Sequence, residues 1–321
     1  MSGSLVAVEE HWLLPELRAA LAGDDSLEFN DTGDRPARLA DLGAGRLAAM
    51  DEQGIDVSIL SLVPPGTHPL PAAEAVRLSR LANDTAAEAV SRHPSRLRAM
   101  ATLPMSAPQE AVAELERAAG LGLTGCMVYG RCGQRHLDDP VYDDLFGAAA
   151  ESGQPVFLHP QLPPQDLRDA AYRGLDPEVD LALASFGWGW HVEAGTAALR
   201  LILRGTFDRH PELQLVLGHW GELLPFWLDR AQSLTHVAGL RRSVAECVRE
   251  NLFLTASGMF NPALLRHALA VTTPDRLLFS TDYPFQHPTR DDIETFLSHL
   301  PAGSHHAVTT TNAAHLYGIP T

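Results

Sequence analysis

The chain has 321 residues, of which 45% are hydrophobic and 20% charged, a balance typical of globular proteins and not of disordered ones. Its net charge of -16 argues against nucleic acid and anionic membranes as partners, because both select a basic surface. All 24 basic residues are arginine, which excludes a Schiff-base lysine and a carbamylated lysine that bridges two metals. A metal centre in this chain should therefore hold one ion, or two ions bridged by a carboxylate.

The cysteines and the hydropathy pattern describe the expected compartment. Cys126, Cys132 and Cys247 form no CxxC pair and leave an odd thiol, so we expect neither a disulfide framework nor a zinc-thiolate cluster. No basic segment with a following apolar segment opens the chain, and no uninterrupted apolar run has the length of a membrane span. We therefore expect a soluble, cytoplasmic protein that acts on a small molecule.

Predicted strands and helices alternate along the chain. The first apolar run, at 6–8, ends in Glu9-Glu10-His11, and residues 12–41 are rich in loop-forming residues. After a helix at 42–52, strands are predicted at 57–62, 97–103, 125–128, 155–158, 213–217, 252–255 and 277–280. The other helices are predicted at 72–91, 108–119, 141–152, 194–207, 222–233 and 262–269. This order predicts a single-domain (β/α)8 barrel, the TIM-barrel class, over residues 1–321, with loop insertions at 12–41 and 160–190 over its C-terminal face.

Metal-binding residue types follow four of the eight predicted strands. Glu9 and His11 alternate with Glu10 and so share one face of the first strand. The other strand ends carry His159 after the fifth strand, His219 and Glu222 after the sixth, and Asp282 after the eighth. Each residue alone has a structural explanation, such as a buried histidine or a helix-capping acid, but in a barrel these strand ends meet at one face. Imidazole and carboxylate ligands without thiolate suit Zn²⁺, Mn²⁺ or Fe²⁺, so the pattern predicts a metal site there.

The residues at these positions resemble the amidohydrolase superfamily, within it the branch of γ-resorcylate, 2,3-dihydroxybenzoate and aminocarboxymuconate-semialdehyde decarboxylases. The resemblance covers nearly the whole chain and is carried most specifically by Leu217-Gly218-His219-Trp220-Gly221-Glu222-Leu223-Leu224-Pro225-Phe226 and Phe279-Ser280-Thr281-Asp282-Tyr283-Pro284-Phe285. It implies that one divalent metal ion, Zn²⁺ or Mn²⁺, is bound by Glu9, His11, His159 and Asp282. It also implies that His219 contacts the substrate and transfers protons, with Glu222 and Arg230 completing a charged network.

The resemblance implies a metal-dependent, non-oxidative decarboxylase of an aromatic, hydroxybenzoate-like or unsaturated carboxylic acid. Glu9 stands where the classical hydrolases of the superfamily have the first histidine of a His-x-His pair, which favours decarboxylation over hydrolysis. Asp282 would deliver the proton to the ring carbon that bears the carboxylate. Two alternatives stay open: a metal-dependent hydrolase or hydratase of the same superfamily, and a barrel that has lost catalysis and serves as a binding or assembly module.

The substrate pocket departs from the hydroxybenzoate decarboxylase pattern. Tyr129, Val63-Pro64-Pro65 and Gln286 replace the residues usual there, so we expect an acid other than a simple resorcylate. The aromatic residues Trp190, Phe285, Trp12 and Tyr129 are predicted to bind its ring. Relatives assemble as dimers or tetramers, and we expect residues 227–248 to supply that contact in a homodimer or homotetramer.

Overall fold

Parallel strands form the centre of the chain in the computed structural model, which describes residues 4–320 apart from the side chains of residues 28–30. Residues 1–3 and 321 of the predicted domain lie outside the described part. The strands are β1 (Val6–Trp12), β2 (Val57–Leu62), β3 (Leu97–Ala99), β4 (Ala101–Thr102), β5 (Cys126–Tyr129), β8 (Val156–His159), β9 (Leu215–Leu217), β10 (Leu252–Thr255) and β11 (Leu277–Leu278). A small antiparallel hairpin, β6 (Arg131–Cys132) and β7 (Arg135–His136), lies outside this set.

The strands close into a barrel. They pair in the orders β1-β2-β3 and β4-β5-β8-β9-β10-β11, and β3 and β4 are two parts of one strand separated by Met100, whose amide donates to the carbonyl of Leu60 at 2.8 Å. The amide of Val8 in β1 donates to the carbonyl of Phe279, directly after β11, at 3.0 Å. This bond joins the last strand to the first, and the predicted (β/α)8 barrel is confirmed.

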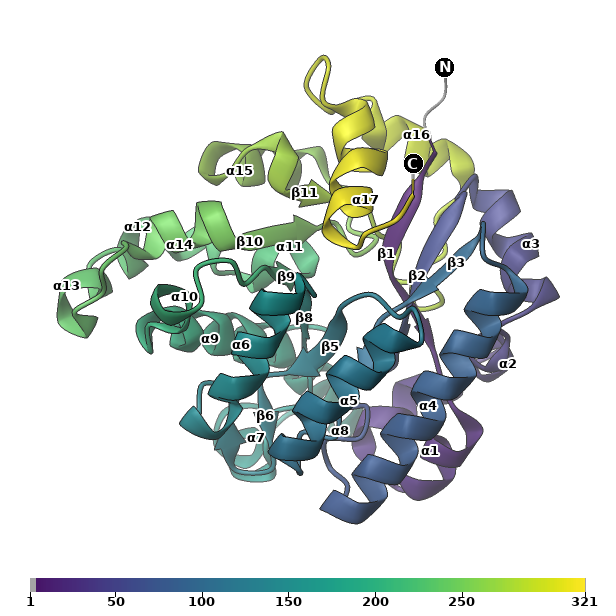
Figure 1. The fold of residues 1–321 in the computed structure, drawn as a ribbon, viewed down its shortest axis with the longest axis horizontal. Helices are drawn as coiled ribbons and strands as arrows, with labels where there is room; N and C mark the ends of the chain where they lie inside the picture. The colour runs from purple at the N-terminus through teal and green to yellow at the C-terminus, as the bar shows by residue number, and fades with distance from the viewer. Residues whose placement is uncertain (1–3, 321) are drawn as a thin grey trace.

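Helices cover the outside of the barrel (Figure 1). The larger ones are α3 (Ala44–Gln53), α4 (Ala72–Arg92), α5 (Pro108–Gly120), α6 (Asp143–Ser152), α9 (Gly189–Leu203), α14 (Val244–Asn251), α15 (Pro262–Val271) and α16 (Arg290–Leu297). Shorter ones are α1 (Pro15–Ala20), α2 (Arg35–Ala40), α7 (Gln165–Ala171), α8 (Pro177–Ala184), α10 (Thr206–Arg209), α11 (His219–Glu222), α12 (Leu228–Ala231), α13 (Leu234–Ala238) and α17 (Asn312–Leu316). Among the described residues, no helix is long and apolar enough to cross a membrane.

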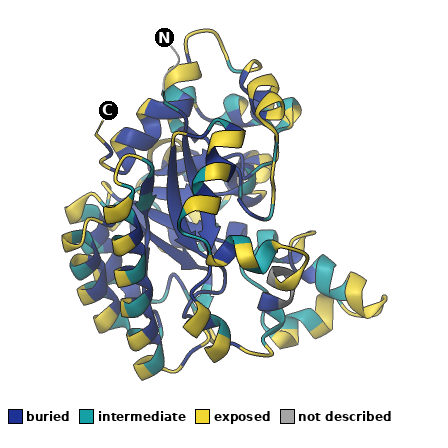
Figure 2. Cartoon of the chain, turned by 90° about the vertical axis from the view of Figure 1, so that its right-hand side faces the viewer, coloured by how far each residue is buried: buried dark blue, intermediate teal, exposed yellow. Residues whose placement is uncertain are grey.

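The strands are buried on both faces, which explains their continuous apolar sequence. Figure 2 shows them in dark blue, with the exposed yellow faces of the helices turned away from them. Inside the barrel, Val8, Ile59 and Phe157 belong to a second apolar cluster together with Tyr317, which follows α17. The segment around α17 thereby packs against side chains inside the barrel. The polar side chains that could carry chemistry lie at the other end of the barrel, where the strands have their C-terminal ends.

The structure corrects several predicted helices. The helix expected at 222–233 is broken into α11, a 3-10 turn at Pro225–Trp227 and α12, because Glu222 and Leu223 have positive φ angles of 53° and 68° and Pro225 follows. The insertion at 12–41, expected as loop, contains α1 and α2, and the one at 160–190 contains α7 and α8. We did not predict α13, α14, α16 and α17.

Candidate metal centre

The structure brings Glu9, His11, His159 and Asp282 together at the C-terminal ends of β1, β8 and β11. One potential ligand atom from each lies within 4.8 Å of the others. His11 Nε2 is 3.2 Å from Asp282 Oδ1, and His159 Nε2 is 3.6 Å from Glu9 Oε1. The side chains of Glu9, His11 and His159 are almost wholly buried, whereas that of Asp282 is 13% exposed. Four donors from three distant parts of the sequence therefore face one point from which a cavity opens.

Hydrogen bonds at the far side of each imidazole aim its Nε2 atom at this point. His11 Nδ1 lies 3.1 Å from the hydroxyl of Ser61 in β2. His159 Nδ1 lies 2.7 Å from the carbonyl oxygen of Pro160, to which it donates. Protein ligands to metals commonly use such a second hydrogen bond to set the tautomer and the ring orientation.

The carboxylate of Glu9 is held in the same way. Its Oε2 accepts hydrogen bonds from the hydroxyls of Thr255, Ser257 and Ser280, which come from the ends of β10 and β11. Its Oε1 has no hydrogen-bond partner among the described residues and faces His159 Nε2. Glu10 points the other way, as the strand alternation predicts, and accepts from the amide and hydroxyl of Thr281 at 3.0 and 2.7 Å.

The donor set fits a divalent cation. Glu9 Oε1 and His11 Nε2 are buried polar atoms that find no hydrogen-bond partner in the described part of the chain, which is costly unless something else occupies the point they face. Burial raises the pKa of Glu9 to about 8 and that of Asp282 to about 7, although the His219 imidazole lowers both. Burial also lowers the pKa of His11 to about 3, so that its ring is neutral, as a metal ligand must be. A bound cation would restore the charged form of both carboxylates.

Beside this cluster, Glu222 bridges two histidines. Its Oε1 is 2.7 Å from His219 Nδ1 and its Oε2 is 2.7 Å from His191 Nδ1. Burial lowers the pKa of His219, but the Glu222 carboxylate raises it to about 10. Burial raises the pKa of Glu222, but the two histidines lower it to about 2.

Within this chain the second partner of Glu222 is His191, which we did not predict, and not Arg230, which we expected in this charged network. Arg230 lies on α12, is exposed, and does not line the cavity described below. The reason is the break at Pro225, after which the chain leaves the strand end on which His219 and Glu222 sit. The sequence did draw attention to the segment that contains His191, because Trp188-Gly189-Trp190-His191 is unusually aromatic. We interpreted that segment as a surface for stacking a ring and not as part of a hydrogen-bond network.

A cavity of about 990 Å³ opens from the cluster. His159, His219, Glu222 and Asp282 lie in its lining, and the predicted ring-binding residues Trp190 and Phe285 form part of its wall. Trp12 and Tyr129 do not line it. Both are nearly fully buried, and the Tyr129 ring packs edge-on against His159 with centroids 6.0 Å apart.

The two insertions supply much of the remaining wall. Arg35, at the start of α2, lines the cavity with its guanidinium carbon 5.2 Å from the centroid of the Phe285 ring. Phe186 and Trp188 come from the connection before α9 and are 54% and 50% exposed, so the outer part of the wall is apolar. Local sequence pattern did not single out Arg35, because a loop insertion carries no periodicity that shows which side chain points inward.

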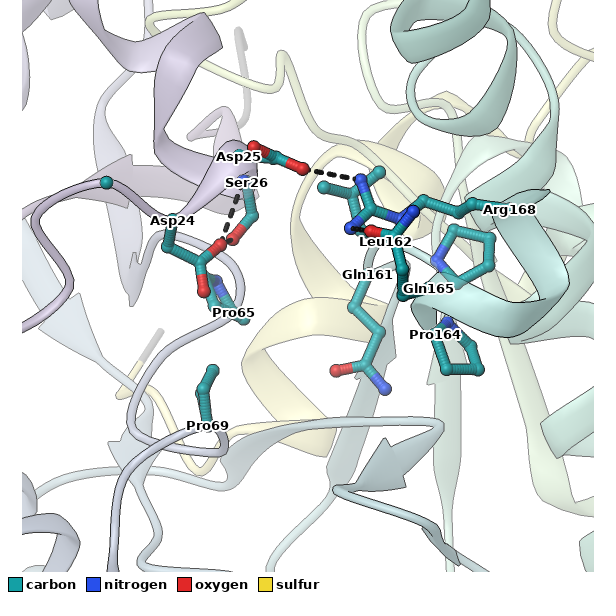
Figure 3. Close-up of a pocket in the computed structure, with 12 residues that line it drawn as sticks. Asp24, Asp25, Ser26, Pro65, Pro69, Gln161, Leu162, Pro164, Gln165 and Arg168 are labelled. Carbon is teal, nitrogen blue, oxygen red and sulfur yellow. Dashed lines mark hydrogen bonds and ion pairs between the residues drawn. The ribbon is translucent and has the colours of Figure 1, made fainter. Parts of the chain in front are cut away.

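A second, smaller cavity of about 330 Å³ lies between the same insertions (Figure 3). Its wall includes Asp24, Asp25, Gln161 and Arg168, and an ion pair of 2.6 Å between Arg168 and Asp25 joins its two sides. Ser26 lines both cavities. None of the predicted metal ligands is among the described residues of this wall, and the Arg168–Asp25 ion pair links the two insertions beside the larger cavity.

Comparisons with known proteins agree with this geometry. The chain is 35% identical over 300 residues to the γ-resorcylate decarboxylase of Rhizobium radiobacter, with 88% of each chain covered. The structure of the 5-carboxyvanillate decarboxylase LigW from Sphingomonas paucimobilis matches with a TM-score of 0.91 and 32% identity, over 99% of this chain and 100% of that one. A dihydroxybenzoic acid decarboxylase from Polaromonas sp. JS666, solved with bound manganese and the inhibitor 2-nitroresorcinol, matches with a TM-score of 0.86 and 30% identity, over 99% and 98% of the two chains. The family model described as amidohydrolase matches residues 27–319, so the chain belongs to the amidohydrolase family.

Proposed function

We propose that the chain is a metal-dependent, non-oxidative decarboxylase of a hydroxybenzoate-like acid. The observation that carries the proposal is the position of Asp282, which belongs to the predicted ligand set and also lines the cavity. A carboxyl group at this place adjoins the metal position and can also contact a ring bound in the cavity. The three relatives reported above are decarboxylases, which supports this reaction over hydrolysis or hydration.

Glu9, His11, His159 and Asp282 would hold the metal, which when bound supplies positive charge to orient an acid and its neighbouring hydroxyl and to draw off negative charge. Manganese in the relative from Polaromonas supports Mn²⁺, and the same nitrogen and oxygen donors also suit Zn²⁺.

The proposed chemistry moves one proton and breaks one carbon-carbon bond. Asp282 is a metal ligand in one step of the cycle and is protonated in another, and in that second step its carboxyl group donates its proton to the ring carbon that bears the carboxylate. The bond from that carbon to the carboxylate then breaks, its electron pair returns to the ring, and CO2 leaves as aromaticity is restored. Asp282 ends as a carboxylate and must regain a proton before the next turnover, and no oxidant or reductant is consumed.

His219 is the group placed to return that proton. It lines the same cavity, and because its Nδ1 is engaged by Glu222 at 2.7 Å, its Nε2 is the nitrogen that would exchange the proton. The opposite charges of Asp282 and His219 influence each other's pKa, as expected for two groups that exchange a proton. We assign His219 to proton transfer and Glu222 to holding its ring.

Binding of the ring falls to the cavity wall. Trp190 and Phe285 offer aromatic faces, and Arg35 provides a cation for an acidic group of the substrate. A cavity of about 990 Å³ with an apolar outer wall of Phe186 and Trp188 is much larger than a single benzene ring needs. We therefore propose a hydroxybenzoate with a further apolar substituent, in keeping with the departures at Pro64 and Gln286, which both line the cavity.

The assembly we propose is a homodimer or homotetramer made through residues 227–248. Trp227 is 63% exposed and Val237 is 82% exposed, and α13 lies at the outer edge of the molecule (Figure 1). Large apolar side chains in such a position are typical of a surface that another copy covers.

We also propose that the chain works in the cytoplasm as one barrel domain. All three cysteines are free thiols, which supports a reducing compartment.

The test is a screen of hydroxybenzoates, including 2,6-dihydroxybenzoate and 5-carboxyvanillate, for CO2 release by protein loaded with Mn²⁺ or Zn²⁺. Release of one CO2 per acid consumed, lost on chelation and restored by metal, supports the proposal. Bound metal with addition of water to a substrate, and without CO2, would assign the hydrolase or hydratase reaction instead.

A further inference from the structure

His191 lies on the side of Glu222 opposite to His219. It belongs to the first turn of α9, whereas His219 and Glu222 follow β9. Both imidazoles place Nδ1 at 2.7 Å from an oxygen of the same buried carboxylate, and their ring centroids are 4.5 Å apart. A carboxylate held on both oxygens has little freedom to rotate.

Trp190 determines which nitrogen of His191 carries the proton. The indole Nε1 of Trp190 lies 2.9 Å from His191 Nε2, and an indole N–H can only donate. His191 Nε2 must therefore present its lone pair to Trp190, and the proton is on Nδ1, facing Glu222. The carbonyl oxygen of Phe186 lies farther from Nε2, at 3.1 Å, and could accept a hydrogen bond from this nitrogen only if the ring carried a second proton.

The backbone holds this arrangement together. His219 and Glu222 have positive φ angles of 47° and 53°, which arise in a tight turn and are unusual for such side chains. Gly195, one turn along α9 from His191, packs directly on the carbonyl oxygen of Glu222, where a Cβ atom would overlap it. The first turns of α9 and the turn after β9 are thus one packed unit.

We propose that His191, with its tautomer set by Trp190, is a positioning residue that acts through Glu222 to orient His219 for proton transfer. This inference rests on the proposed decarboxylation. Without the N–H of His191, Glu222 Oε2 would be a buried carboxylate oxygen lacking this partner, and the ring of His219 would lose its fixed direction.

Two substitutions separate positioning from packing. His191→Phe keeps a ring but removes the N–H, whereas His191→Asn is smaller but places an amide N–H near the position of Nδ1. In the metal-loaded enzyme we expect His191→Phe to lower kcat about 10- to 100-fold with little change in KM, and His191→Asn to recover most of that loss. Equal losses in both variants, a loss confined to KM, or full activity of His191→Phe would overturn the proposal.

A measurement on the unsubstituted, zinc-loaded protein does not depend on the reaction. Nitrogen-15 NMR of the histidine side chains, assigned with His191→Phe, should find His191 protonated at Nδ1. Protonation at Nε2 alone would overturn the inference even if CO2 release is observed. Protonation at Nδ1 in a protein that releases no CO2 would leave the hydrogen-bond chain standing and refute the proposed function instead.

Discussion

Asp282→Asn tests the proposed proton donor directly. In the unsubstituted protein, Asp282 Oδ1 lies 3.2 Å from His11 Nε2. The asparagine side chain has nearly the same shape and keeps one oxygen to face that nitrogen, but it cannot donate an acidic proton. Because a positioned general acid contributes about 10²- to 10⁴-fold to a rate, we expect kcat to fall by that factor. This corresponds to about 3 to 5 kcal/mol in the activation barrier.

The assay must separate the lost proton from a weakened metal site. We would measure CO2 release under saturating Mn²⁺, together with the metal content and the affinity for 2-nitroresorcinol, the inhibitor bound in the relative from Polaromonas. Asp291→Asn is the matched control, because Asp291 is an exposed carboxylate in the first turn of α16. Full activity of metal-loaded Asp282→Asn would refute the assignment, and a defect that excess metal repairs would leave Asp282 as a ligand only.

Four further outcomes follow from the same geometry. Chelation should abolish activity and lower the melting temperature measured by calorimetry, because a ligand at 100 times its Kd stabilises the folded state by about 2.7 kcal/mol. In the metal-free protein, the raised pKa of His219 stabilises the folded state fully at pH values below 6.5, the ordinary pKa of a histidine, and this stabilisation is lost as the pH rises towards about 10. Urea unfolding should therefore find that the difference in free energy of unfolding between the unsubstituted protein and His219→Gln shrinks across that range. Gly195→Ala should destabilise by about 1 to 3 kcal/mol in urea unfolding, since its Cβ would overlap the carbonyl of Glu222, whereas Gly120→Ala, which meets no atom within 4 Å, should not. Arg35→Ala should raise KM about 10-fold or more with a smaller change in kcat, measured by CO2 release; an unchanged KM would remove Arg35 from substrate binding.

Local sequence determined the barrel and its predicted ligand set. Each strand is a short apolar run bounded by turn residues, because helices cover the sheet and leave its faces dry. The potential ligands Glu9, His11, His159 and Asp282 each sit at or just beyond the end of such a run. Once eight runs predict a closed barrel, the convergence of their ends follows from the fold. These four positions could therefore be predicted from the sequence before the tertiary structure was known.

Only the tertiary structure decided what surrounds that set. Arg35 enters the cavity from one insertion and His191 from the first turn of α9, directly after the other, and no periodicity predicts the course of either insertion. Pro225 and the positive φ angles at the strand end break the expected helix, so Arg230 lies on the surface while His191 takes its place on Glu222. The physical reason is that a strand end is specified by its own few residues, whereas a cavity wall and a bridging hydrogen bond depend on segments that meet only when the chain has packed.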